Sequence, residues 1–400
     1  MIFLRALLVG GLAAALPARA VYAPIPEQEQ GKNLTYTLRA GVSYDSNLFG
    51  ADQGEVDSVI WTFAPKVVYD ASVTDQTFVA ASYSLVLDQF ENRPGDKLLD
   101  SHDLSLRVAH AFSKSTTIDV TEAYTRSANP EALLVGLPPN ADGTPQRNPD
   151  QSFERNQLDG RFQTPLSPKA GIIVKARTVY YNYYKNAVLA RSIDRTENLI
   201  GVAGDYAILP ELKGVAEYRH QDVYYRKLGE TKNKHSDYLM AGADYAVAKK
   251  LSVSGRAGAE WRRRAAADDV TTPYLELSGK FDYTEGSFIV FGTSYSLEET
   301  TDTVRFTDTQ VNRYFLNVQH AVTKLIVASG SFTFEPSELQ GRRGQPDVEE
   351  TTVRSGAALS YLPGKNWTIS ANYDYDHVWS GISAREMARH RVGLNALYTF

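Results

Sequence analysis

The residues best placed to do chemistry are a run of four, Asp374-Tyr375-Asp376-His377, because a carboxylate near an imidazole could activate water as a general base. Such a group would suit a hydrolase such as a surface protease. In an extended strand, however, the neighbours Asp376 and His377 point to opposite faces. The chain has no G-x-S-x-G motif and no H-E-x-x-H motif, and its seven histidines are scattered. We therefore expect a protein that is not an enzyme, with no metal site and no cofactor, and interpret the run as polar residues near a strand end.

Composition excludes several other classes. The 400 residues are 43% hydrophobic and 22% charged, and none is a cysteine. Disulfides, thiolate metal sites, cysteine nucleophiles and a lipoprotein anchor are therefore excluded. Abundant aromatic residues (24 Tyr and 16 Phe) with a formal charge of only −5 argue against disorder. An isoelectric point of 5.9 argues against nucleic acid as a partner.

The first twenty residues predict a cleaved secretion signal. Arg5 supplies a positive start, residues 6–16 are apolar, and Ala18-Arg19-Ala20 is an A-x-A cleavage site, with cleavage after Ala23 as the alternative. The apolar run is shorter than the roughly 20 residues that a membrane-spanning helix needs. We expect the chain to divide into a signal peptide (1–20), a periplasmic lead (21–32) and one β-barrel domain (33–400).

Apolar residues then recur at every second position to the end of the chain. Two of these apolar faces are Trp61, Phe63, Val67 and Tyr69, and later Ile289, Phe291, Tyr295 and Leu297. Such alternation predicts strands with one apolar and one polar face. We count about 18 segments of about 11 to 15 residues, long enough to cross a bilayer when tilted. Mean hydropathy is only −0.33, which is typical of barrel strands because their two faces average to neutral.

The connections between these segments alternate between short and long. Short ones lie near 71–76, 113–115, 166–169, 209–211, 248–250, 284–287, 322–324 and 362–365. Long ones lie near 45–55, 89–102, 126–152, 185–195, 226–235, 263–270, 299–308, 336–350 and 379–387. This asymmetry is typical of outer-membrane barrels, and a soluble β-sandwich has no reason to keep it.

The fold class that we predict is all-β: a transmembrane, antiparallel, up-and-down β-barrel of about 18 strands in the bacterial outer membrane. The alternation is weakest near residues 116–124 and 325–334, and Glu122 falls on the predicted outer face. The last segment, residues 389–400, alternates well and ends in Phe400. It resembles the C-terminal strand of bacterial outer-membrane barrels, in which the terminal aromatic residue implies recognition by the assembly machinery. A half-buried edge strand of a soluble sandwich is the alternative.

Charged and small side chains occupy the face opposite the apolar one, and in a barrel of this size they would line a wetted lumen. The lumen-lining candidates are Arg107, Lys175, Arg177, Arg219, Arg256, Glu260, Lys280, Arg313, Arg354 and Arg391. Tyrosines gather at strand ends, for example Tyr180, Tyr181, Tyr183 and Tyr184. We favour an aromatic belt at the membrane surface for them, with sugar stacking as the alternative.

The longest connection, residues 126–152, contains an apolar piece that would be costly to leave in water. Its constriction-loop candidates are Leu133, Leu134, Val135 and Leu137. Either this loop folds into the barrel as a constriction or plug, or it contacts a partner or another protomer.

The string from Ala40 to Phe49, AGVSYDSNLF, is the most specific local motif. A first strand that ends in such a turn resembles the β-barrel porin-2 type of outer-membrane proteins, including EpsL-like members. This resemblance implies an 18-stranded barrel and, because those proteins are often associated with exopolysaccharide or capsule export, a role in that export. It supplies no catalytic or ligand residues. We interpret Asp45, Ser46 and Asn47 as turn residues, with a metal site as the minor alternative.

We therefore expect a channel that passes an anionic polysaccharide along its inner Arg and Lys residues, while loop 126–152 restricts access. The expected partners are outer-membrane lipid, the assembly machinery through Phe400, the polysaccharide and proteins of an export complex. On this mechanism, replacing Arg177, Arg219 and Arg256 together weakens polymer passage. A general or solute-specific porin and a structural or adhesive surface barrel without transport are the alternatives; an enzyme is the least supported class.

Overall fold

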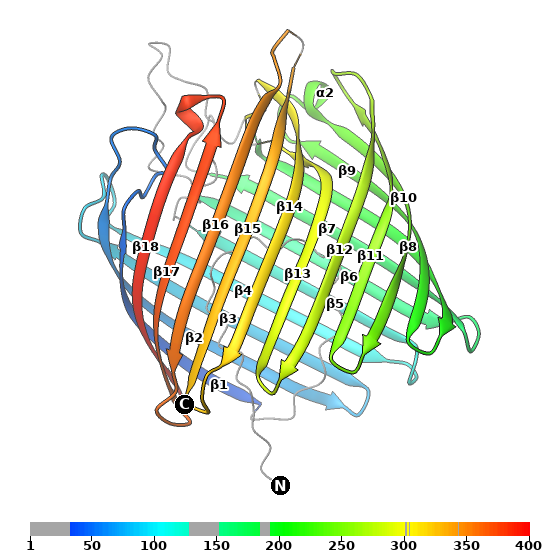
Figure 1. The fold of residues 1–400 in the computed structure, drawn as a ribbon, viewed down its shortest axis with the longest axis horizontal. Helices are drawn as coiled ribbons and strands as arrows, with labels where there is room; N and C mark the ends of the chain where they lie inside the picture. Colours follow the sequence, from blue (N-terminus) through cyan, green and yellow to red (C-terminus); the bar gives the residue numbers. More distant parts are fainter. Residues whose placement is uncertain (1–32, 128–151, 185–192, 301, 304, 343) are drawn as a thin grey trace.

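Eighteen antiparallel strands form one closed sheet in the computed structural model, which describes residues 33–127, 152–184, 193–300, 302–303, 305–342 and 344–400 (Figure 1). Each strand pairs with the next one along the chain, and β18 pairs with β1 to close the barrel. The fold class predicted from alternation is thus confirmed. The strands are β1 Leu34–Asp45, β2 Ser58–Thr74, β3 Thr77–Phe90, β4 Leu98–Ala111, β5 Thr117–Ser127, β6 Phe153–Pro165, β7 Ala170–Tyr183, β8 Arg195–Leu209, β9 Leu212–Tyr225, β10 Lys234–Ala248, β11 Leu251–Arg264, β12 Val270–Thr284, β13 Ser287–Glu299, β14 Phe306–Ala321, β15 Ile326–Gly341, β16 Val348–Tyr361, β17 Trp367–Ser380 and β18 Met387–Thr399.

The described parts of the long connections include a short helix, α2 (Gly229–Lys232), and a 3₁₀ turn, η1 (Ser383–Arg385). Within the described residues, no helix has the length and the apolar character needed to span a membrane.

The short connections all lie at one end of the barrel, where the C-terminus also lies (Figure 1). Four of them have only two residues, at 75–76, 210–211, 249–250 and 285–286. The strand register shifts beside each of these four turns. In the last of them Gly286 has a φ of 71°, a conformation that costs glycine little. Tight turns of this kind join neighbouring antiparallel strands directly.

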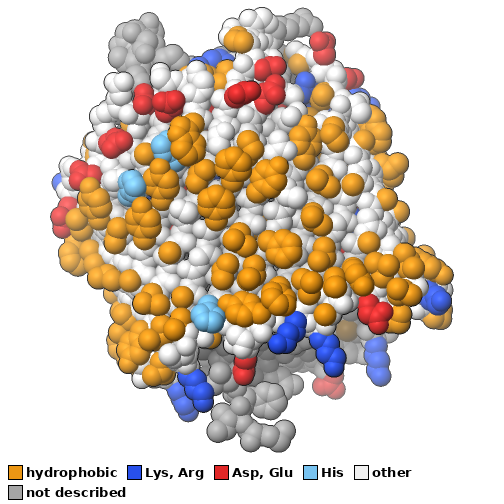
Figure 2. Space-filling model, in the orientation of Figure 1, with side chains coloured by type: hydrophobic (Ala, Val, Ile, Leu, Met, Phe, Trp, Pro, Cys, Tyr) orange, Lys and Arg blue, Asp and Glu red, His pale blue; other side chains and the backbone are white. Residues whose placement is uncertain are grey.

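Large apolar side chains cover the outside of the barrel, as Figure 2 shows over β13 to β18. On β4, for example, Leu104 and Leu106 are 49% and 43% exposed. The polar side chains that alternate with these leucines point to the inside of the barrel. Among them, Arg107 forms an ion pair with Asp119 of β5. This pattern is the reverse of a water-soluble protein and fits a surface that faces lipid.

Two strands extend into segments that the sequence predicts as loops. The predicted loop 336–350 is shorter, because β15 continues through Pro336 to Gly341. Pro336 pairs with Thr351 of β16, whereas the pairing with β14 skips from Phe334 to Ser337. Proline has no N–H to donate, so it breaks one ladder without ending the strand. Similarly, β4 begins at Leu98 inside the predicted loop 89–102.

The motif that ends the first strand is structural. Asp45 accepts the backbone N–H of Asn47 (3.0 Å) and forms a buried ion pair with Arg389 of β18. The Asn47 side chain bonds to the backbone of Ala51 at 2.8 and 2.9 Å and to the carbonyl of Ala388 at 3.1 Å. These contacts tie the first long loop to the last strand, so the residues serve the turn, as their types suggest.

Candidate functional site in the barrel interior

Each of the ten lumen-lining candidates lies in a strand, and each has an oppositely charged group 3.7 Å away or less. The pairs are Arg107 with Asp119, Lys175 and Arg219 with Glu217, Arg177 with Asp159, Arg256 with Asp244, Glu260 with Arg262, Lys280 with Asp282, Arg313 with Glu298 and Glu335, Arg354 with Glu335, and Arg391 with Asp376. The candidate cations therefore belong to a wall of alternating charge.

Several of these contacts join strands that are not neighbours in the sheet. The Lys175 ammonium on β7 lies 3.0 Å from Glu217 on β9, and Arg219 on β9 donates to the Tyr274 hydroxyl on β12 at 3.1 Å. Side chains on the outside of a closed barrel diverge, whereas those on the inside converge. Such contacts therefore lie in the interior.

The ends of β13 and β14 leave the wall and lie inside it. The last pair between β13 and β12 is Tyr295 with Leu275. β12 itself stays paired with β11 as far as Val270, so its first residues have β11 on one side and no β13 on the other. Pro273 lies in the stretch of β12 that β13 has left, and it has no N–H for a ladder. Beyond Tyr295, β13 still pairs with β14, so the two strands form a hairpin end (296–311) that β12 does not hold.

Asp308 is the centre of the contacts that fix this hairpin end. It is fully buried, and its carboxylate lies 2.5 Å from Arg262, 2.8 Å from Lys234 and 2.5 Å from Arg264. Lys234 belongs to β10 and the two arginines to β11, so these bonds reach past β12. Three cations around one buried carboxylate hold the hairpin end against the inner wall at the end of the barrel with the long loops.

Glu299, at the end of β13, adds a second acidic group to this cluster. It accepts from Lys234 at 2.7 Å and from the Tyr225 hydroxyl of β9 at 2.5 Å. The backbone carbonyl of Leu297 accepts from Arg262 at 3.0 Å. The Leu297 side chain is only 5% exposed, so its predicted place on the lipid face is wrong. The alternation fails there because the hairpin end has turned inward.

The tip of the hairpin reaches the loop between β9 and β10. The ammonium of Lys232 in α2 donates to the Thr303 hydroxyl at 2.7 Å, and Arg342 donates to the Thr231 carbonyl at 3.3 Å. Burial, together with the nearby cations Arg342 and Lys234, lowers the pKa of Lys232 to about 8. Hydrogen bonds thus hold the hairpin tip next to Lys232, whose protonated form is disfavoured by burial.

A cavity of about 280 Å³ lies beside the hairpin end in the interior. Its lining includes Arg219, Tyr274, Glu276, Leu297 and Arg313. Guanidinium, carboxylate and phenol groups side by side can hold a small polar molecule through several hydrogen bonds at once.

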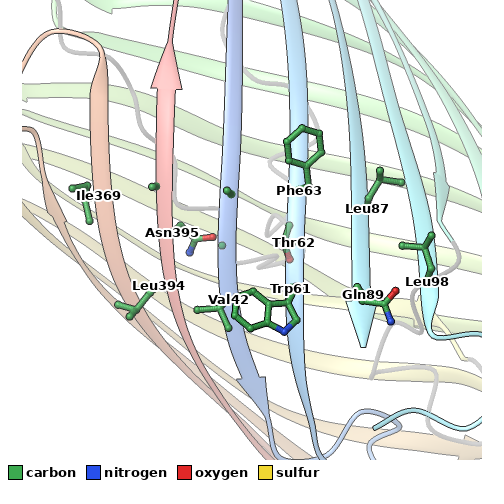
Figure 3. A pocket seen from close by; sticks show the side chains of 13 residues that line it. Val42, Trp61, Thr62, Phe63, Leu87, Gln89, Leu98, Ile369, Leu394 and Asn395 are labelled. Atoms are coloured by element: carbon green, nitrogen blue, oxygen red, sulfur yellow. The ribbon is translucent and has the colours of Figure 1, made fainter. Parts of the chain in front are cut away.

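A larger hollow, of about 660 Å³, lies on the outer surface across the seam between β1 and β18 (Figure 3). Its walls include Trp61, Phe63, Ile369 and Leu394, each at least 45% exposed. A hollow lined by these apolar side chains faces lipid and offers little to a polar solute.

The strand-end tyrosines divide between the two faces, as alternation requires. Tyr181 and Tyr183 are buried in an interior cluster with Phe153, Val179 and Ile193. Tyr180 and Tyr184 are exposed on the other face, at 36% and 37%.

The acid–base run at the end of β17 does not form one site. Asp376 binds Arg391 at 2.8 Å, and His377 contacts the Tyr375 hydroxyl at 2.6 Å. Among the described residues, no group of three or more His, Asp or Glu side chains is arranged to hold a metal ion. The predicted constriction-loop residues Leu133, Leu134, Val135 and Leu137 lie outside the described residues.

Sequence comparison decides the family. The family described as "Putative beta-barrel porin 2" matches residues 169–400. The chain belongs to this family. Porins are transport channels, and membership in a porin family together with the barrel fold points to the bacterial outer membrane. No curated protein matches the chain.

Several solved structures are similar to the chain at low sequence identity. A BenF-like porin from Pseudomonas fluorescens Pf-5 matches with 9% identity and a TM-score of 0.50, over 92% of this chain and 99% of that one. The outer membrane protein opdK from Pseudomonas aeruginosa matches with 10% identity and a TM-score of 0.47, over 92% and 99%. The copper transporter OprC matches with 11% identity and a TM-score of 0.46; the match covers 90% of this chain and 64% of that transporter.

Sequence reasoning did not single out Lys234, Arg262, Glu299 or Asp308. Arg262 lies on the polar face of its strand, so the same alternation could have found it. Lys234 lies inside the predicted long loop 226–235, and Glu299 and Asp308 lie at the edges of the predicted loop 299–308, where alternation gives no direction.

Proposed function

We propose that this protein is an outer-membrane channel for small polar solutes, narrowed at its outer end by the β13–β14 hairpin end. The observation that carries this proposal is the cluster of Lys234, Arg262 and Asp308, which holds two strand ends inside the barrel. Long loops mark the outer end of single-chain outer-membrane barrels. At about 280 Å³, the cavity beside the hairpin lies just below the usual range for small-molecule sites, roughly 300–1,000 Å³, so it suits a small solute.

The paired charges of the inner wall favour solutes that are neutral or zwitterionic. A cation that already has a carboxylate beside it attracts an external anion weakly, because the two opposite fields largely cancel at distances longer than the ion pair itself, and salt screens what remains over a Debye length of about 8 Å. A sugar or amino acid can still exchange hydrogen bonds with both partners of a pair.

Export of an anionic polysaccharide, which the family resemblance implies, remains a prediction. The paired state of Arg177, Arg219 and Arg256 does not favour a track of free positive charge. An extended polymer would also have to pass the hairpin end.

The test is reconstitution of the purified protein in planar bilayers and in liposomes. We expect measurable conductance with weak ion selectivity, and liposome swelling with small sugars that falls off as the sugar grows. Neutralising Arg177, Arg219 and Arg256 together should shift selectivity toward cations, because their carboxylate partners remain. No conductance and no swelling would overturn the channel and favour a structural barrel. Polysaccharide lost from the cell surface in a deletion strain, with solute uptake unchanged, would favour export.

A further inference from the structure

The outer face of β5 to β7 differs from the rest of the outside. Glu122, in the middle of β5, pairs with Leu106 of β4 on one side and with Leu158 of β6 on the other. Both leucines are exposed on the outer face, at 43% and 45%, so the exposed Glu122 side chain points outward as well. Asn156 of β6 donates its amide N–H to Glu122 Oε1 at 3.0 Å. A carboxylate and a carboxamide thus share a surface that should meet lipid.

The polar groups continue from there toward the outer rim. On the same face, Asn182 of β7 donates to Glu154 of β6 at 3.2 Å. Between the short turn and Glu122, the outward residues of β5 are only Ile118 and Val120. The stretch of β5 from the turn to Glu122 is therefore apolar over roughly 14 Å along the strand. The apolar band of an outer-membrane barrel is roughly 25 Å tall. The lipid-facing band is therefore interrupted on this side.

Two outward positions on this side carry no side chain. Gly160 of β6 and Gly204 of β8 are on the outward face, and a methyl group added at either position would meet no atom within 4 Å. β15 lies nine strands from β6, on the opposite side of the eighteen-stranded barrel. There the outer surface carries Phe332 and Phe334, which are 44% and 36% exposed. Figure 2 shows the apolar cover on that opposite side.

We propose that a second copy of this chain covers the outer face of β5 to β7 in the membrane. Polar side chains at membrane depth need partners, because hydrocarbon offers none. Glu122 and Asn156 already share one hydrogen bond within the chain. A carboxylate and a carboxamide can each bind more than one partner at once, so two copies related by a twofold axis can add bonds through the same groups. An acyl chain could fill the space above the glycines but could not bond to Glu122.

Cysteine cross-linking tests this contact, since the chain has no cysteine of its own. Leu158→Cys places a thiol beside Glu122, and Phe332→Cys places one on the opposite side at nearly the same exposure, 44% against 45%. We expect oxidation in intact outer membranes to give a product of twice the chain mass with Leu158→Cys and only monomer with Phe332→Cys. Monomer with both, or a product of another mass with Leu158→Cys, would overturn the proposal.

The mass of the purified protein in detergent gives a second measurement. Gly160→Trp should convert a dimer to a monomer, because the indole fills the open space between the copies. Gly330→Trp on β15 is the matched control; the nearest atom to an added methyl group there is 3.7 Å away. Both variants should keep the shift between heated and unheated samples on a gel, which reports a folded barrel. A monomeric wild-type protein, or dimers that survive in folded Gly160→Trp, would contradict the proposal.

Discussion

Arg389 and Asp45 join the last strand to the first at the residue scale. Both side chains are nearly buried, with 10% and 2% exposed, and two guanidinium nitrogens reach the carboxylate. The same carboxylate also accepts the backbone N–H of Asn47. One side chain therefore serves both the closure of the barrel and the turn that follows β1.

Asp45→Ala should cost about 3–5 kcal/mol of unfolding free energy, because it leaves a buried guanidinium without its partner. The measurement is urea unfolding of the protein in lipid vesicles. Asp57→Ala is the control; Asp57 is exposed, and its carboxylate accepts from the Tyr44 hydroxyl at 3.1 Å and from the Asn92 amide at 3.5 Å. A surface change of this kind should stay within about 0.5 kcal/mol. Equal effects of the two substitutions would show that the buried pair has no special role.

At the scale of elements, the β13–β14 hairpin end depends on Asp308. Asp308→Ala leaves Lys234, Arg262 and Arg264 facing one another without the central carboxylate. We expect the hairpin end to leave the interior, with higher single-channel conductance and a larger size limit in liposome swelling. The substitution should lower the free energy that holds the hairpin end in place by about 3–5 kcal/mol, as when one partner of a buried ion pair is removed.

Asp244→Ala is the control for that experiment, because Asp244 pairs with Arg256 away from the hairpin end and is 44% exposed. Conductance that stays at the wild-type value in Asp308→Ala, while the barrel remains folded, would contradict a role of the hairpin in narrowing the channel.

The contact between α2 and the hairpin tip should depend on pH. The folded-state pKa of Lys232, about 8, lies below its ordinary value of 10.5. The folded loop therefore disfavours the protonated amine, and this cost is fully present below about pH 8. It declines as pH rises from 8 toward 10.5, so the loop becomes more stable in that window.

Hydrogen exchange of the amides near residues 229–233, corrected for the intrinsic rate at each pH, measures this change. Protection should rise between pH 8 and 10.5 in the wild type. In Lys232→Met it should be flat across the window. A wild-type profile as flat as that of the variant would show that Lys232 does not titrate there.

At the scale of the whole molecule, closure of the barrel brings the C-terminal residue against the first strand. The backbone N–H of Phe400 donates to the Tyr36 carbonyl of β1 at 2.9 Å, and its ring lies edge-on to Tyr398 with centroids 4.7 Å apart. The ring itself is 57% exposed on the outside. An assembly factor could therefore reach the ring before the barrel closes.

Phe400→Ala should lower the amount of folded barrel in the outer membrane several-fold without lowering the unfolding free energy of the barrel that does form. The backbone bond to Tyr36 does not need the side chain. Membrane fractionation measures the first quantity, and urea unfolding measures the second. Phe332→Ala removes an equally apolar outward ring from β15 and should leave assembly unchanged. An equal loss of folded barrel in both variants would argue against terminal recognition.

The sequence by itself determined the barrel. Alternation fixes which face of each strand meets lipid, and the rhythm of short and long connections fixes the order, number and direction of the strands. It also found ten charged residues of the polar face, such as Arg219 and Arg313, because a lipid-facing Arg or Lys is costly near the middle of the membrane.

Only the tertiary structure decided how those charges pair and where the interior narrows. Lys175 and Glu217 are 42 residues apart, and Arg262 and Asp308 are 46 apart. Such partners meet only after the sheet has closed. Leu297 has the spacing of a lipid-facing residue, yet β13 has already left β12 at that point and its side chain is buried. Periodicity describes a strand relative to its own axis, whereas pairing across the lumen depends on the curvature of the whole sheet, which no local pattern encodes.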